Sequence, residues 1–240
     1  MREELTKDGK GVKCYFGDKV SCMRPKIGGH MHEVLPVGVL GEFVVDRKIA
    51  TEEDVKSMKL RSAMSFSYGE YYDFEPGTYT RLLQGNNTVM SDTPMEIRTN
   101  DDFVFAAKGK VLIGGLGLGV VLLKIQDKVE VESIVVVEKY KDVIQLVGAK
   151  LPLNSKVTIV EGDIFEWLPE KGVIFDTIYF DIWTNMCADN YLEMKELHKR
   201  FRKYFLKDKE RRWMSSWRYD WAQQEHYEDN KCERMRGMYR

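Results

Sequence analysis

Three carboxylates stand at the ends of apolar runs in the second half of the chain. Glu138, Asp163 and Asp181 each end, or directly follow, a short stretch rich in β-branched and aromatic residues. A carboxylate accepts hydrogen bonds from hydroxyl and amino groups, and it can take up a proton during a reaction. Scattered surface acids would not fall so regularly at the ends of apolar runs, so the spacing indicates one shared site.

A glycine-rich loop precedes the first of these carboxylates. In the segment IGGLGLG, Gly115, Gly117 and Gly119 stand at alternate positions, Gly114 precedes them, and Leu116 lies between the first two. Glycine permits positive φ and lets a ligand approach the backbone, and a helix that begins after the loop offers free N–H groups. The spacing G-x-G-x-G differs from the dinucleotide fingerprint, and the loop lacks the lysine of a P-loop. It favours a nucleoside-like ligand without a large phosphate load.

The elements around these residues predict an α/β fold. Short apolar runs alternate with helical patterns from residue 110 onward, which is typical of a Rossmann-like, doubly wound and mainly parallel sheet. In such a sheet the carboxyl ends of the strands meet at one edge, and ligands bind there. The expected strands are 110–115, 133–139, 156–163, 176–183 and 211–217. The expected helices are 118–128, 139–150 and 190–206, with a short helical turn at 164–171 and a further polar helix after 217.

The first part of the chain is less regular. It contains β-like runs and one charged helical pattern at 51–64, for which Thr51 is a suitable N-cap. We therefore expect a β-rich N-terminal extension over 1–90, which partly covers the cleft, and a Rossmann-like domain over 91–240.

The ordered set of glycine loop and acids resembles the class I S-adenosylmethionine-dependent methyltransferases, especially their spermidine-synthase-like branch. The segments MSDTPME and FDIW are similar to those of uncharacterised phage and bacterial methyltransferase-like proteins. The resemblance implies bound S-adenosyl-L-methionine, with Glu138 on the ribose and Asp163 near the adenine, whose face Ile164 would cover. The expected cofactor-binding residues are Gly114, Gly115, Leu116, Gly117, Gly119, Glu138, Lys139, Asp163, Ile164 and Asp181.

The acceptor side of the site is less defined. Asp181 is the leading candidate to orient an acceptor or act as general base, and Trp183 could form a wall of the pocket or fill core space. Asp92, Thr93 and Glu96 could form a lid over the cleft. The same segment also suits a helix start, with an N-cap at Ser91 or Asp92 and a capping box completed by Glu96. The sequence does not identify the acceptor.

Two other functions stay open beside methyl transfer. Aminopropyl transfer would use the same fold with the decarboxylated cofactor, although DIWTN lacks the second acid found at that position in spermidine synthases. A catalytically silent, cofactor-binding protein could instead contact nucleic acid through the nine basic residues between 195 and 212. Nucleic-acid binding is not favoured, because the stripe Leu192, Leu197, Phe201 and Phe205 turns these basic residues toward solvent.

Composition sets the remaining limits. The chain has 240 residues, 43% of them apolar, and a formal net charge of -1, so neither nucleic acid nor a membrane surface is a natural partner. Few, widely spaced cysteines and the lack of an apolar leader favour a cytoplasmic setting. The set Cys14, Cys22, His30 and His32 matches no usual zinc spacing, so no metal is expected. We expect His198 and His226 to face solvent, and homodimer formation stays open.

Overall fold

The structure is a computed structural model of the whole chain. Its backbone is described here for residues 2–5, 12–16, 19–23, 31–64, 74–185 and 187–238, and its side chains for 31–61, 74–185 and 187–231.

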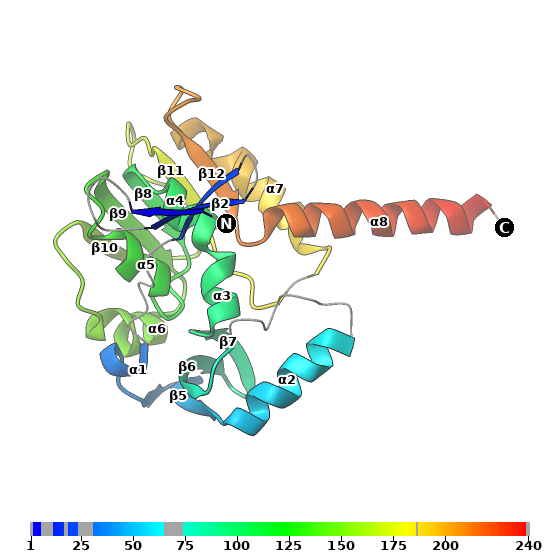
Figure 1. Cartoon of the computed structure of the whole chain (residues 1–240). Coiled ribbons are helices and arrows are strands. Elements are labelled where there is room, and N and C mark those ends of the chain that lie inside the picture. The colour runs from blue at the N-terminus through cyan, green and yellow to red at the C-terminus, as the bar shows by residue number, and fades with distance from the viewer. Residues whose placement is uncertain are drawn as a thin grey trace.

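Five parallel strands form the central sheet (Figure 1). They lie in the order β10-β9-β8-β11-β12, so the strand order reverses between β8 and β11. This is the Rossmann-like α/β fold that the sequence predicts. The reversal point is where ligands bind in doubly wound sheets. The strands are β8 (Gly109–Gly114), β9 (Val131–Glu138), β10 (Val157–Glu161), β11 (Thr177–Phe180) and β12 (Trp213–Ser216).

Helices connect the strands and cover both faces of the sheet. Side chains of α4, α5 and α6 pack on one face, and Leu197 and Phe201 of α7 pack on the other. The last helix, α8, extends away from the body (Figure 1). The elements are α3 (Pro94–Thr99), α4 (Asp101–Ala106), α5 (Val120–Ile125), α6 (Lys141–Leu146), η1 (Gly148–Lys150), α7 (Asn190–Phe201), η2 (Arg202–Tyr204) and α8 (Tyr219–Met238).

The short helical turn expected within 164–171 is present, and it does not extend into a helix. The N–H groups of Glu166 and Trp167 both donate to the carbonyl of Asp163, which makes a single turn. Pro169 then stops propagation, because it lacks an N–H donor and disfavours the helical conformation of the residue before it.

The β-rich N-terminal extension is confirmed. An antiparallel sheet of order β4-β5-β6-β7 precedes α3, and the hydroxyl of Thr51 accepts the N–H of Asp54 at 3.1 Å to cap α2. The division at residue 90 falls within β7 and stays a proposal. The elements are α1 (Met31–Val34), β4 (Gly38–Leu40), β5 (Phe43–Ala50), α2 (Glu52–Met64), β6 (Gly77–Gln84) and β7 (Asn87–Ser91); a separate antiparallel sheet contains β1 (Arg2–Leu5), β2 (Val12–Phe16) and β3 (Lys19–Met23).

One core joins the antiparallel sheet to the parallel one. Phe43, Val45 and Leu82 of β5 and β6 are buried in the same cluster as Leu118 and Ile125 beside the central sheet. Burying a side chain of this size stabilises the fold by about 1.5–3 kcal/mol. The antiparallel sheet is therefore held against the glycine loop rather than tethered to it by the chain alone.

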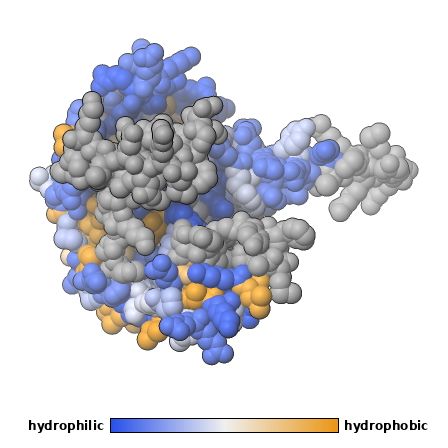
Figure 2. Space-filling view, in the orientation of Figure 1, coloured by the Kyte–Doolittle hydropathy of each residue, from blue (hydrophilic) through white to orange (hydrophobic). Residues whose placement is uncertain are grey.

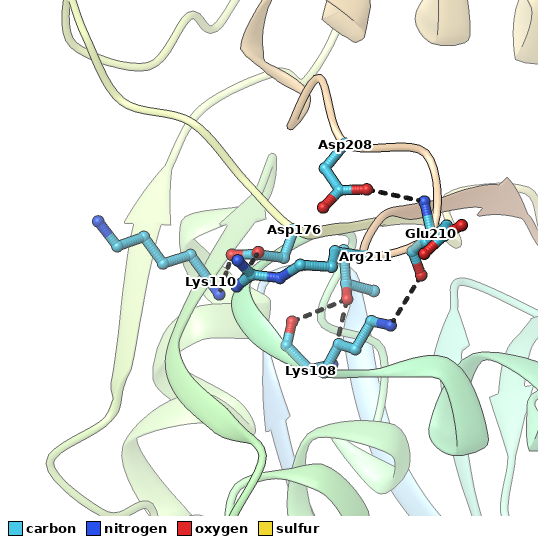
Figure 3. Close-up of polar contacts among 7 residues, drawn as sticks. Lys108, Lys110, Asp176, Asp208, Glu210 and Arg211 are labelled. Carbon is cyan, nitrogen blue, oxygen red and sulfur yellow. Dashed lines mark hydrogen bonds and ion pairs between the residues drawn. The ribbon is translucent and has the colours of Figure 1, made fainter.

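The amino ends of the central strands are tied together by polar contacts (Figure 3). The carboxylate of Asp176 accepts the N–H of Lys110 at 2.9 Å and lies 3.8 Å from the guanidinium of Arg211. Gly109 has a φ of +60°, and a Cβ there would lie 2.4 Å from Asp176. These contacts fix β8, β11 and β12 at the edge opposite the predicted site.

Helix α7 differs from the expected pattern at two residues. Leu192 is 53% exposed, because the buried stripe runs through Met194, Leu197 and Phe201, and Leu192 is out of phase with it. His198 does not face solvent: its Nε2 lies 2.9 Å from the hydroxyl of Ser216, and burial lowers its pKa to about 4.

On the face shown in Figure 2, the coloured residues are mostly hydrophilic over the upper body and along the coloured part of α8, and apolar side chains gather lower down. Most of the basic residues from 195 to 212 are exposed, as expected.

Within the described residues, no helix is long and apolar enough to span a membrane. Over the same part of the chain, no cluster of three His, Cys, Asp or Glu side chains could hold a metal ion. The Cys14, Cys22, His30 and His32 set lies outside the described side chains, apart from His32.

Candidate active site

A cavity of about 590 Å³ opens at the carboxyl edge of the central sheet, where the strand order reverses. This volume lies within the range of roughly 300–1,000 Å³ that is usual for small-molecule sites. Its walls come from the ends of the parallel strands, from α3, and from strands β5, β6 and β7. The predicted residues that line it are Gly115, Leu116, Gly117, Glu138, Lys139, Asp163, Ile164, Asp181, Trp183 and Glu96.

The glycine turn passes very close to the neighbouring strand. Gly115, Gly117 and Gly119 all have positive φ, and a Cβ on Gly115 would lie 2.2 Å from the backbone oxygen of Asp181. The close approach of β8 and β11 therefore already requires glycine at this position. Gly114 is buried in β8, and Gly119 caps α5 against Leu151, so neither belongs to the wall of the cavity.

Glu138 ends β9 and is buried beside the glycine turn, with 6% of its surface exposed. Its Oε2 accepts the N–H of Leu116 at 2.8 Å, and its Oε1 accepts the N–H of Tyr140 at 2.9 Å. Burial raises the pKa of this carboxyl, and the backbone donors counteract the rise. Each oxygen retains a further lone pair, so the carboxylate can accept the hydroxyl groups of a ligand.

Asp163 lies after the next strand, β10. Its Oδ2 pairs with the ammonium of Lys139 at 2.9 Å, and its Oδ1 accepts the N–H of Phe165 at 2.9 Å. The hydrogen bond from Lys139 lowers the pKa of Asp163. Ile164 is buried next to it and presents an apolar surface to the same cavity.

A second pair of carboxyl groups faces the cavity from β11 and α3. Burial, together with the smaller effect of the negative charge of Glu96, raises the pKa of Asp181 to about 7. Burial also raises the pKa of Glu96 to about 7, although Ser91 donates both its N–H, at 2.8 Å, and its hydroxyl, at 2.5 Å, to Oε2. Like charges in one desolvated site favour retention of a proton. The pair can therefore gain and lose protons near neutral pH.

Two indole rings line the cavity near these acids. The Nε1 of Trp183 donates to Oε2 of Glu193 at 2.8 Å, and the Nε1 of Trp217 donates to the hydroxyl of Thr99 at 2.9 Å. Arg218, with a φ of 51°, also lines the cavity. A non-glycine residue in this region is uncommon, and strained residues cluster at functional sites.

The segment expected to form a lid has a partly different role. The buried carboxylate of Asp92 accepts the N–H groups of Met31 at 2.8 Å and Thr80 at 2.6 Å, which ties α1 to β6. Helix α3 begins at Pro94 with Thr93 as its N-cap, not at Ser91 or Asp92 as expected, because Asp92 is engaged elsewhere. Of these three residues, Glu96 lines the cavity, whereas Asp92 and Thr93 do not. A lid role for the segment stays a prediction.

Met90 is a contact that sequence reasoning missed. Its thioether sulfur accepts the N–H of Leu118 at 3.2 Å. A Cβ added to Gly117 would lie only 2.4 Å from the same sulfur, so Met90 packs directly against the glycine turn. Trp217 and Arg218 were also missed, although both follow the fifth strand and the strand-end rule could have found them. Met90 and Glu193 carry no such signal, because tertiary packing alone brings them to the cavity.

Comparisons with known proteins give partial similarities. No protein-family model and no curated protein matches the chain. A methyltransferase from Streptomyces caelestis, CcbJ, is 23% identical over 48% of this chain and 46% of its own, with a TM-score of 0.38. The plantazolicin methyltransferase BpumL, solved with SAH, is 15% identical over 65% and 58%, with a TM-score of 0.33. The tRNA (m1A58) methyltransferase TrmI from Aquifex aeolicus is 16% identical over 43% and 41%, with a TM-score of 0.34.

The matches therefore span about half the length of these solved proteins. All three of these structures are methyltransferases, and none of them is a spermidine synthase.

Proposed function

We propose that this protein transfers a methyl group from S-adenosyl-L-methionine to an acceptor. One observation carries the proposal: a buried carboxylate, Glu138, lies at the glycine turn where the strand order reverses and faces a cavity of ligand size. In doubly wound folds, this position receives the ribose of a nucleoside ligand.

The residues around Glu138 fit the cofactor. Glu138 would accept the ribose hydroxyls, and Asp163 and Ile164, which follow β10 and line the same cavity, would contact the adenine. Gly115 and Gly117 line the cavity and carry no side chain, so the turn can offer its backbone to a ligand at these two positions. When bound, the cofactor supplies a methyl group that is already activated by its sulfonium.

The protein's own contribution is alignment and proton handling. Holding two reactants in the correct geometry can lower the activation free energy by roughly 7–11 kcal/mol in favourable cases. Asp181 and Glu96 can orient an acceptor and take its proton, since the pKa of each is about 7. The residues of β5, β6 and β7 that wall the cavity would restrict water on the side facing away from the central sheet.

Aminopropyl transfer is a second candidate, in line with the spermidine-synthase-like resemblance. The acidic, indole-lined side of the cavity favours it, because a polyamine acceptor would need such groups. Turnover with putrescine and the decarboxylated cofactor would support it over methyl transfer.

Calorimetry with S-adenosylhomocysteine tests the cofactor proposal. We expect the wild type to bind, and Glu138→Gln to bind at least about tenfold more weakly, because a hydrogen bond to a charged group contributes about 1.5–3 kcal/mol. Glu132→Gln is the matched control, since Glu132 is exposed near the opposite end of the same strand and should leave affinity unchanged. Absence of binding in the wild type, or equal binding in Glu138→Gln, would overturn the proposal.

A further inference from the structure

The side of the cavity away from the glycine turn is acidic and aromatic. It contains the carboxyl groups of Glu96, Asp181 and Glu193 and the rings of Trp183 and Trp217. Over its whole wall the cavity has five acidic residues (Glu96, Glu138, Asp163, Asp181 and Glu193) and two basic ones (Lys139 and Arg218). Lys139 pairs with Asp163, so one of the two cations is already matched by an acid. The balance favours a cationic ligand.

Hydrogen bonds within the protein fix these groups in place. Trp183 donates its ring N–H to Glu193, and Trp217 donates its ring N–H to Thr99. The two rings can then offer a ligand their π faces, which attract a cation. Ser91 holds Glu96 through two donors, and the backbone N–H of Asp181 donates to the carbonyl of Gly114 at 2.8 Å. The acceptor side is therefore arranged before a ligand arrives.

We infer that the acceptor is an amine that enters as its ammonium ion and is held by Glu96 and Asp181 beside the indole of Trp183. The inference rests on the proposed function and specifies its substrate class. A carboxylate or phosphate acceptor would face the excess of acids in the cavity. A neutral alcohol would leave Glu96 and Asp181 without a partner for their charge.

The chemistry of an amine acceptor balances with these residues. The ammonium passes one proton to the carboxylate of Asp181. The nitrogen lone pair then forms a bond to the methyl carbon, while the bond between that carbon and the sulfonium sulfur breaks and its electron pair stays on the sulfur. The methylated amine leaves as an ammonium ion, and Asp181 returns its proton to solvent.

The raised pKa values support this proton transfer. An alkylamine resembles lysine, whose reference pKa is about 10.4. Transfer of its proton to an ordinary carboxyl group is unfavourable by roughly a millionfold, whereas a carboxyl group with a pKa of about 7 reduces this to roughly a thousandfold. The acids of the pair are therefore better matched to an amine than surface acids would be.

Binding of three probes of similar size tests the inference. Butylammonium, 1-butanol and butanoate are titrated at pH 8 by saturation-transfer NMR, once with the cofactor-free protein and once with the protein saturated with S-adenosylhomocysteine. We expect butylammonium to bind at least about tenfold more tightly than the other two. Glu96→Gln and Asp181→Asn should each weaken butylammonium binding by at least about tenfold, and Glu132→Gln should leave it unchanged.

Equal affinity for butylammonium and 1-butanol, a preference for butanoate, or unaltered butylammonium binding in both acid variants would overturn the inference. The cofactor-free titration separates it from the proposed function. If S-adenosylhomocysteine does not bind, the proposed function fails, and the amine preference of the cavity is still decided by the three probes.

Discussion

At the residue scale, the glycine turn shows how the fold and the site share the same constraints. Gly115 is required because a Cβ would lie 2.2 Å from the backbone oxygen of Asp181, and its φ of +96° is strained for any other residue. The same close approach brings Asp181 to the edge of the cavity beside the turn. Gly115 is therefore required for the packing of β8 against β11, and this packing positions Asp181 beside the turn.

Gly115→Ala tests this reading against a control with nearly the same backbone. Gly172 has a φ of +92° with no atom within 4 Å of an added Cβ, so Gly172→Ala carries the cost of the backbone conformation alone. We expect Gly172→Ala to lower the unfolding free energy by about 1–2 kcal/mol and Gly115→Ala by about 3 kcal/mol or more. Chemical denaturation measures both. Equal losses in the two variants would show that the contact with Asp181 does not constrain the turn.

The sequence predicted the residues that stand at strand ends. Glu138, Asp163 and Asp181 follow apolar runs, and alternation along the chain brings those ends to one edge, so their meeting could be foreseen. Met90 and Glu193 could not be found in this way, because β7 and α7 reach the cavity only through packing across the core. The partly buried position of His198, against Ser216, was missed for the same reason.

At the element scale, the contact between β7 and the glycine turn links the two sheets. Met90 extends from β7 and accepts the N–H of Leu118, which is fully buried. The next residue, Ser91, donates to Glu96 of α3, and Asp92 fastens α1 and β6. The segment that the sequence identified as a candidate lid, together with Met90, therefore connects the antiparallel sheet to the glycine turn and to Glu96, which both line the cavity.

Met90→Leu keeps the apolar volume of this contact and removes its acceptor. The N–H of Leu118 would then be buried without that partner, which costs about 1–3 kcal/mol. We expect an unfolding free energy lower by about 1 kcal/mol and an affinity for S-adenosylhomocysteine lower by several-fold. Met58→Leu is the matched control, because Met58 lies in α2, packs against a separate apolar cluster and should change neither quantity appreciably. No difference between the two variants would contradict the role of Met90.

At the scale of the whole molecule, the acid pair should make stability depend on pH. In the folded protein the pKa of Glu96 and of Asp181 is about 7, above the values of 4.5 and 3.8 for the free side chains. The folded state then binds more protons than the unfolded state between about pH 4 and pH 7. The stability from these groups is present below pH 4 and is lost as the pH rises toward 7.

Glu96→Gln should reduce the loss of stability that occurs as the pH rises toward 7. The substitution abolishes the titration of Glu96, and it removes the charge that helps to raise the pKa of Asp181. We expect the variant to have a higher Tm than the wild type at pH 8, by about 2–4 °C for each kcal/mol recovered, with a smaller difference at pH 4.5. Scanning calorimetry at the two pH values measures this. A variant that is less stable at pH 8 than the wild type would show that the two carboxyl groups do not oppose each other.

The most direct test of the account is an experimental structure of the protein soaked with S-adenosylhomocysteine. We expect the ribose on the carboxylate of Glu138, the adenine beside Asp163 and Ile164, and the thioether directed toward Asp181. A cofactor bound outside this cavity, or a cavity that stays empty in the soaked crystal, would contradict the proposal.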